Sequence, residues 1–173
     1  MQVLVTASHW LARLGQWVSG IALLALMSVT VADVLTRLIF RFTAGSLNLS
    51  FNGSVELVSY LMMFSLLAAM AANIEKSQVV VEAFSHRLPE TFKRRLAGLF
   101  LFGFCVLGMV MAWGLWQEAT IAAGRGQVTQ DLRIPMGPIY QFGALLCALL
   151  AARGLMHAVL AGIFASGEDA ANE

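Results

Sequence analysis

The side chains of this sequence best suited to ligate a haem or a metal ion are three histidines and two cysteines: His9, His86, His157, Cys105 and Cys147. Haem ligation across a bilayer needs histidines that face one another inside hydrophobic helices. His86 instead lies in a charged stretch, and we expect His9 and His157 to be solvated near one membrane surface. Both cysteines lie inside apolar runs, where they are interpreted as small packing residues. The pattern therefore predicts no haem, metal or other cofactor.

Two acidic positions could carry a different chemistry. Asp33 lies four residues before Arg37, the orientation that favours an ion pair along a helix. A carboxylate near hydrocarbon could instead relay protons or bind a cation. We favour the ion pair, because Arg37 is within reach and both residues follow the end of an apolar run. Glu56 falls in the first turn of a predicted helix, where a carboxylate suits the helix dipole and Ser54 is a candidate N-cap.

The remaining residues offer no catalytic arrangement. No Ser-His-Asp set, phosphate-binding loop or pair of intramembrane carboxylates can be assembled from them. A self-sufficient transporter would carry broken helices or polar groups along a path through the membrane, and the apolar runs supply neither. The sequence therefore predicts neither an enzyme nor an independent transporter.

Four runs free of Asp, Glu, Lys and Arg set the architecture: Leu14–Ala32, Leu57–Ile74, Leu96–Gln117 and Ile134–Ala152. Each is long enough for a helix to cross the hydrocarbon core of a bilayer, about 30 Å at 1.5 Å per residue. The chain is 59% hydrophobic and only 12% charged. We expect an all-α integral membrane protein, a single domain over residues 1–173 with spans at about 14–36, 55–74, 96–117 and 134–156.

An amphipathic segment separates the second and third spans. Between Glu75 and Arg95 the apolar positions gather on one helical side, which is typical of a helix lying in the membrane interface. We expect a bend at Pro89, because proline fits poorly inside a helix. The basic residues Arg94 and Arg95 then mark a membrane surface, and Pro135 is expected just inside the start of the fourth span.

Small residues recur at four-residue intervals in two of the spans. They are Ser65, Ala69 and Asn73 in the second, and Ala144, Ala148 and Ala152 in the fourth; glycines at positions 98, 103 and 108 form a looser pattern in the third. Such stripes let helices approach closely in lipid. They predict helix contacts at Ala69, Ala144 and Ala148, either within the chain or against a second protein.

The distribution of cations predicts the orientation. One side of the membrane would hold seven, Arg13, Lys76, Arg87, Lys93, Arg94, Arg95 and Arg153, and the other would hold four, Arg37, Arg41, Arg125 and Arg133. Cytoplasmic loops carry the excess of lysine and arginine, so both termini are expected in the cytoplasm. The net charge is only +1, and the charged residues are dispersed along the chain. Nucleic acid is therefore not expected as a partner.

Several short stretches together resemble the small membrane subunit, the DctQ-like or Q subunit, of tripartite ATP-independent periplasmic (TRAP) transporters. The stretches are Asp33-Val34 with Arg37 and Phe40; Glu56-Leu57 with Tyr60-Leu61; Lys76 to Val79 with Val81 and Glu82; Leu88-Pro89 with Arg94-Arg95-Leu96; and Gln127, Thr129, Leu132, Ile134-Pro135 and Tyr140. They cover Ala32 to Ala152 in the expected order. Gln78, where the family often has histidine, and Gln130-Asp131, where it often has Pro-Ala, depart from the pattern.

The resemblance implies a non-catalytic subunit of the bacterial inner membrane. Its partners would be a large multi-span membrane subunit, which carries the substrate and sodium sites, and a periplasmic protein that delivers an organic acid. Asp33, Arg37, Glu56, Arg94, Arg95 and Pro135 would then hold the topology or contact the partner. A small four-helix membrane anchor of a haem- or quinone-linked redox complex remains the alternative.

Overall fold

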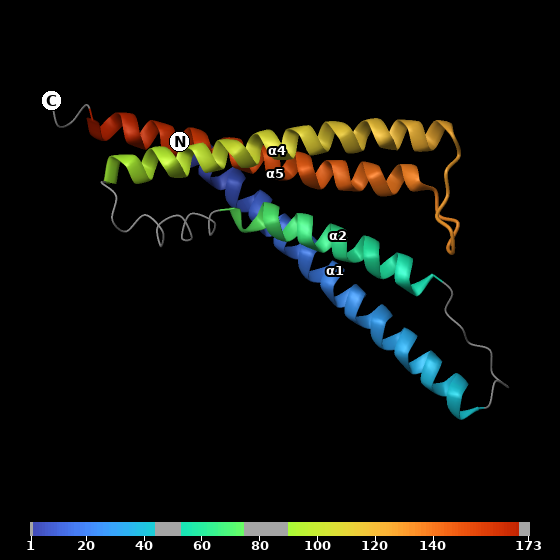
Figure 1. The fold of residues 1–173 in the computed structure, drawn as a ribbon. Coiled ribbons are helices and arrows are strands. Elements are labelled where there is room, and N and C mark those ends of the chain that lie inside the picture. The colour runs from blue at the N-terminus through green and yellow to red at the C-terminus, as the bar shows by residue number, and fades with distance from the viewer. Residues whose placement is uncertain (1, 44–52, 75–89, 170–173) are drawn as a thin grey trace.

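The computed structural model describes residues 2–43, 53–74 and 90–169 (Figure 1). Four long helices fill these ranges: α1 (Gln2–Phe42), α2 (Ser54–Ala72), α4 (Glu90–Gly124) and α5 (Met136–Asp169). All four are long and apolar enough to span a membrane, over Ser8–Phe42, Ser54–Ala72, Gly98–Gly124 and Met136–Val159. The predicted all-α membrane fold is confirmed.

Most of the helices extend beyond the predicted spans. α4 begins at Glu90, so Arg94 and Arg95 lie in its first two turns instead of before it. α5 begins at Met136, which puts Pro135 just ahead of the helix and not inside it, and it continues to Asp169. Residues 75–89 of the predicted interfacial segment, with the bend at Pro89, lie outside the described residues, and its last residues, 90–95, belong to α4.

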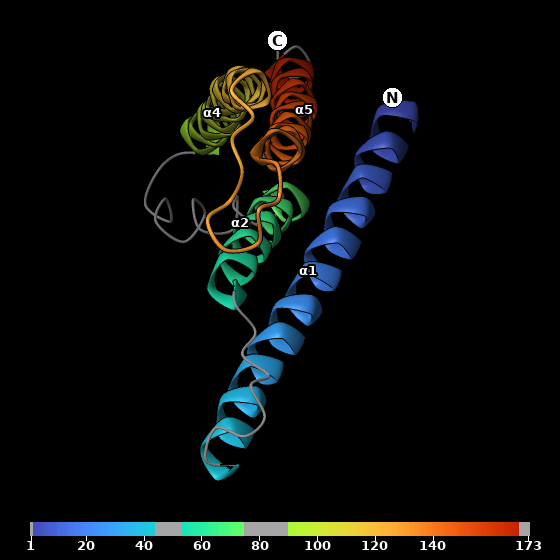
Figure 2. The same cartoon turned by 90° about the vertical axis from the view of Figure 1, so that its right-hand side faces the viewer.

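The helices form two antiparallel pairs that meet along one line of contact. α1 packs against α2, and α4 packs against α5 (Figure 1). The pairs are joined where α2 contacts α5, with a smaller contact between α1 and α5. Figure 2 shows α1 at one edge of this arrangement and α4 near the other. α2 is therefore the helix through which one pair is attached to the other.

Close approach within each pair depends on glycine facing small residues. In the α1–α2 pair, a Cβ atom built on Gly15 would lie 3.1 Å from the Ala68 carbonyl oxygen and from Cβ of Ala72. In the α4–α5 pair, a Cβ atom on Gly108 would lie 2.8 Å from the backbone nitrogen of Ala151. By contrast, nothing lies within 4 Å of such an atom on Gly98 or Gly103. Of the three glycines in the pattern predicted for the third span, only Gly108 contacts another helix.

The core lies where the two pairs meet. Ala71 and Ile74 at the end of α2 pack with Leu101 of α4 and Leu150 of α5, all almost fully buried. Near the middle of α2, the rings of Phe64 and Phe142 meet edge to face, with 4.9 Å between their centroids. Cys105 and Cys147 are buried free thiols between α4 and α5, as expected of packing residues.

Replacing Gly108 by alanine should destabilise the α4–α5 pair, because the new methyl group meets backbone atoms of α5 that no side-chain rotation can move. Overpacking of this kind costs about 1–3 kcal/mol. The measurement is the free energy of unfolding in detergent micelles, followed by helical circular dichroism during denaturant titration. Gly103→Ala is the matched control on the same helix, since its methyl group enters open space and alanine favours a helix by up to about 1 kcal/mol. Equal stability of the two variants would contradict the close contact.

Candidate functional site

Two polar clusters hold the ends of α2, and they contain most of the polar side chains that link different helices among the described residues. The first, called here the α2 start cluster, consists of Asp33, Ser54, Glu56 and the backbone of residues 130–132. The second, the α2 end cluster, consists of Ser8, Arg153 and His157 with the carbonyl groups of Ala71 and Ala72.

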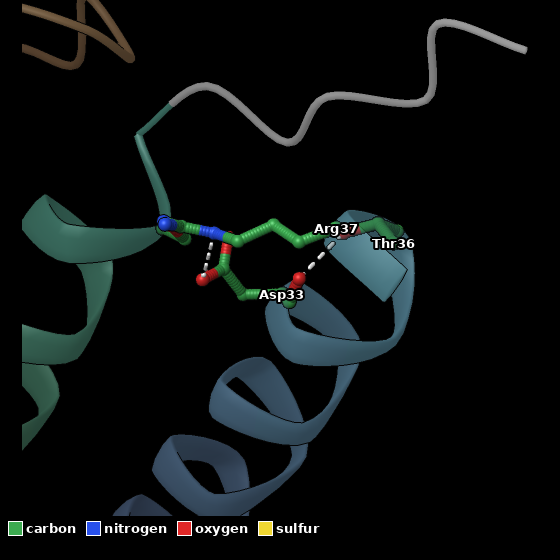
Figure 3. Close-up of polar contacts among 4 residues, drawn as sticks. Asp33, Thr36 and Arg37 are labelled. Atoms are coloured by element: carbon green, nitrogen blue, oxygen red, sulfur yellow. Dashed lines mark hydrogen bonds and ion pairs between the residues drawn. The ribbon is translucent and has the colours of Figure 1, made fainter. Parts of the chain in front are cut away.

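Asp33 joins α1 to the beginning of α2. One carboxylate oxygen accepts a hydrogen bond of 2.8 Å from the Ser54 hydroxyl, and the other lies 2.9 Å from Nε of Arg37. Figure 3 shows the predicted Asp33–Arg37 ion pair, with the Thr36 hydroxyl donating to the Asp33 carbonyl oxygen. Because the carboxylate is engaged on both sides, its geometry is that of a helix connector. The observed contacts give no support to a proton relay.

The predicted N-cap role of Ser54 is wrong. Gly53 occupies the cap position with a φ of 94°, and no side chain caps α2 there. Ser54 is already the first helical residue, so its hydroxyl is free to donate to Asp33. A side chain on Gly53 would also collide with Leu132, 2.6 Å from the position of the added Cβ atom. Glycine is therefore needed here both for its left-handed backbone and for the close approach of the loop.

Glu56 holds the α4–α5 loop, residues 125–135, against the start of α2. Its carboxylate accepts hydrogen bonds from three successive backbone N–H groups, those of Gln130 at 2.7 Å, Asp131 at 3.3 Å and Leu132 at 3.2 Å. Charge-assisted bonds of this kind are stronger than neutral ones. The sequence predicts a structural role for Glu56 through the helix dipole. The structure shows in addition that Glu56 binds a loop 74 to 76 residues further along the chain.

The α4–α5 loop is also braced internally. Val128 and Pro135 form an isolated antiparallel bridge, and the Thr129 amide donates to the Ile134 carbonyl oxygen at 2.9 Å. The Ile134 amide returns a bond of 3.1 Å to the hydroxyl of Thr129, a residue that is nearly fully buried. The loop therefore has a defined shape before α5 begins.

At the other end of α2, Arg153 of α5 donates to the last carbonyl groups of the helix. Its side chain is fully buried, and one guanidinium nitrogen donates to the carbonyl oxygens of Ala71 and of Ala72, the latter at 2.7 Å. The other terminal nitrogen lies 3.5 Å from the Ser8 hydroxyl of α1, which is 3.0 Å from Nε2 of His157. A cation also suits the negative end of a helix dipole. Three helices meet at this residue.

Arg153 corrects two predictions. The cation count places Arg153 at the membrane surface on the side of the termini, whereas it lies inside the apolar part of α5 with its side chain among the other helices. Arg153 should therefore be left out of the cation count that predicts the orientation in the membrane. Six cations then remain on the side of the termini, against four on the other side. The sequence also indicates this position, because residues 154–165 continue an apolar run in which His157 is the one polar side chain.

The other predicted residues do not gather with these clusters. His9 is exposed, and among the described residues no three His, Cys, Asp or Glu side chains lie close enough to hold a metal ion. Ala144 is nearly fully buried, Ala69 is partly buried and Ala148 is exposed. Arg94 and Arg95 lie at the start of α4, away from the start cluster, and Pro135 is exposed. What the two clusters can do is hold helices together; no described contact positions an acid, a base or a nucleophile for reaction.

Replacing Arg153 by methionine should destabilise the protein by about 2–6 kcal/mol, because two buried carbonyl groups lose their donors at about 1–3 kcal/mol each. Arg153→Lys should recover part of this loss, since an ammonium group keeps the charge and can donate to either carbonyl. Unfolding in detergent measures both effects. The control is Arg13→Met, on an exposed position of α1. If Arg153→Met were no less stable than the control, the cap would have no energetic role.

Glu56→Gln should loosen the α4–α5 loop without unfolding the helices. An amide carries only one acceptor oxygen and no charge, so three N–H groups cannot all keep strong bonds. Hydrogen–deuterium exchange at residues 130–132 should quicken about tenfold. Glu118→Gln is the control, because Glu118 is exposed on α4 and no hydrogen bond to its side chain is found among the described residues. Unchanged exchange in the Glu56 variant would show that the carboxylate does not hold the loop.

A comparison with protein families gives a match over most of the chain. Residues 26–162 match the family described as tripartite ATP-independent periplasmic transporters, DctQ component. The comparison with curated proteins found no match, and neither did the comparison with solved structures. The matched range contains the whole of α2 and α4, most of α5, the part of α1 from residue 26 onward and the whole of the α2 start cluster. The chain belongs to the DctQ family and is the small membrane subunit of a TRAP transporter.

Proposed function

We propose that this subunit is a scaffold that carries no transport site of its own. It would enlarge the fixed part of a large membrane subunit, which binds the solute and sodium and moves during transport. A periplasmic binding protein would deliver the solute, an organic acid, and the sodium gradient would drive uptake. The family match over residues 26–162 carries this proposal.

The disposition of the polar groups supports a scaffold. In the part of the chain that the structure describes, the charged side chains of Asp33, Glu56 and Arg153 connect elements far apart in the sequence, and each is engaged with other parts of the same chain. A transport site needs polar groups that are free to exchange water for a solute or an ion. Within the described residues, these three groups are instead occupied by helix-to-helix contacts.

The open arrangement of the helices supports a partner in the membrane. α1 and α4 leave long rows of large apolar side chains exposed, among them Leu24 at 67% and Val110 at 66% of their surface. Lipid can cover part of these faces and a second membrane protein the rest. Ala148, exposed on α5 beside Leu145, remains our predicted contact with that protein. Ala144 is already used within the chain.

We infer an inner-membrane location with both termini in the cytoplasm. The N-terminus of α1 and the C-terminus of α5 lie at the same end of the molecule (Figure 1). Six cations against four favour the cytoplasm for that end. Exposed tryptophans occur near the beginning of α1, at Trp10 and Trp17, and toward the far end of α4, at Trp113 and Trp116. Aromatic residues at two levels are typical of the two membrane interfaces.

Reconstitution tests the proposal. The tagged chain should co-purify with its large membrane subunit in mild detergent, and liposomes containing both should take up solute when sodium and the binding protein are supplied. Liposomes containing this chain alone should take up none, because the chain has no transport site. Liposomes containing the large subunit alone are the matched control and should also fail. Uptake by this chain alone would contradict the proposal, and so would full uptake by the large subunit without it.

A further inference from the structure

The outward face of α1 carries an arginine between two tryptophans. Gly15 faces α2, since a Cβ atom built on it would lie 3.1 Å from Cβ of Ala72. Arg13 and Trp17 each lie two residues from Gly15, which places them about 200° around the helix, on the side turned away from α2. Trp10 lies within about 60° of Arg13 by the same spacing. The two tryptophans expose 63% and 71% of their surface, and Figure 2 shows α1 at one edge of the molecule. This face is therefore open to the membrane.

Arg13 lies at the edge of the hydrocarbon core. It immediately precedes the apolar run Leu14–Ala32, which at 1.5 Å per residue is about as long as the core is thick, about 30 Å. Tryptophan rings settle at the level of the lipid headgroups, and those of Trp10 and Trp17 lie about one turn to either side of Arg13. The guanidinium group is therefore placed at the level of the lipid phosphates, with an aromatic ring above and below it.

The charge of Arg13 has no counterpart on its own helix face. α1 contains no Asp or Glu before Asp33, and Arg13 forms no ion pair with another described residue. Ser8, the α1 residue bonded to α5, lies about 140° around the helix from Arg13. At this level of a bilayer the available anion is a lipid phosphate, which arginine binds through two parallel N–H bonds. A headgroup with a net negative charge is favoured, because it carries no cation of its own that competes with the arginine.

The same face continues into the apolar run in an order that matches a phospholipid. Gln16, about one turn deeper than Arg13, is exposed, and no hydrogen bond to its side chain is found among the described residues. An amide without a partner is costly in hydrocarbon, but it can donate to the ester carbonyl groups that follow the phosphate in a lipid. About one turn further, nothing lies within 4 Å of a Cβ atom built on Gly20. This leaves room for an acyl chain beside the exposed Leu24.

We propose that the outward face of α1 from Trp10 to Leu24 binds one acidic phospholipid, in the leaflet on the side of the termini. Arg13 binds the phosphate group, Gln16 donates to an ester carbonyl, and the acyl chain lies along Gly20, with the tryptophan rings on either side of the headgroup. The inference goes beyond the proposed function and does not depend on it, because it requires only that α1 crosses a bilayer. With this face covered by lipid, the large membrane subunit contacts the chain elsewhere.

Photolabelling tests the site. The full-length chain is placed in nanodiscs of phosphatidylcholine that contain a small fraction of phosphatidylglycerol with a photoreactive diazirine on its acyl chain. Labelled residues are then mapped by mass spectrometry, and the experiment is repeated on the complex with the large membrane subunit. In both samples the label should concentrate in residues 16–24. A probe with the same acyl chain and a phosphatidylcholine headgroup should label this segment roughly fivefold less.

Variants assign the effect to the named side chains. Arg13→Gln should lower labelling of residues 16–24 by the acidic probe roughly fivefold, as expected for the loss of one cation at the membrane surface. Arg13→Lys should recover part of it, since the charge remains but the two parallel bonds do not. Gln16→Ala should cause a smaller loss, roughly twofold to threefold. The control is Arg41→Gln, the same change of charge at an exposed position near the other end of α1, which should label as the wild type does.

Three results would overturn the inference. The first is equal labelling of residues 16–24 by the acidic and the neutral probe, and the second is equal labelling in the Arg13→Gln and Arg41→Gln variants. The third is labelling of the chain alone that disappears in the complex, because the large subunit would then cover this face. None of these readouts measures uptake of solute. Failure of the lipid site is therefore distinguishable from failure of the proposed function.

Discussion

A helix that ends among other helices leaves its last carbonyl groups where water cannot bond them, and α2 is such a helix. Arg153 supplies the missing donors at this end, and Ser54 and Glu56 connect the beginning to α1 and to the α4–α5 loop. α2 is also the main link between the two helix pairs. The relative placement of the four helices therefore depends on a few polar contacts at its two ends.

This constraint explains how a chain can carry charges inside its membrane domain that serve to hold its helices together. A buried arginine in a transporter would ordinarily suggest an anion path. Here the guanidinium group is turned to the end of a neighbouring helix, where carbonyl groups and the helix dipole satisfy it. The polar groups that a solute would need for binding are the same ones that hold the helices together. A subunit built in this way is suited to brace a partner.

The sequence predicts the helices and the local ion pair, because both depend on residues close together in the chain. Apolar runs indicate the four helices, and the four-residue spacing of Asp33 and Arg37 indicates their contact. The contacts of Glu56 with residues 130–132 and of Arg153 with Ala71 depend on which helices are neighbours, and no spacing in the sequence encodes that. Counting Arg153 among the cations at one membrane surface also hid its burial. The exposed alanine at position 148 shows the same limit, since a stripe of small residues does not reveal what it packs against.

A scaffold of the kind proposed is expected to stay fixed while its partner moves. Pulsed electron paramagnetic resonance between spin labels on Leu24 of α1 and Val110 of α4, both exposed, measures the separation of the outer helices in the assembled transporter. The account predicts one unchanged distance in the absence of ligands, with sodium, and with sodium, solute and binding protein. A pair of labels on the large subunit should shift under the same conditions. A change in the distance between α1 and α4 during transport would contradict the account.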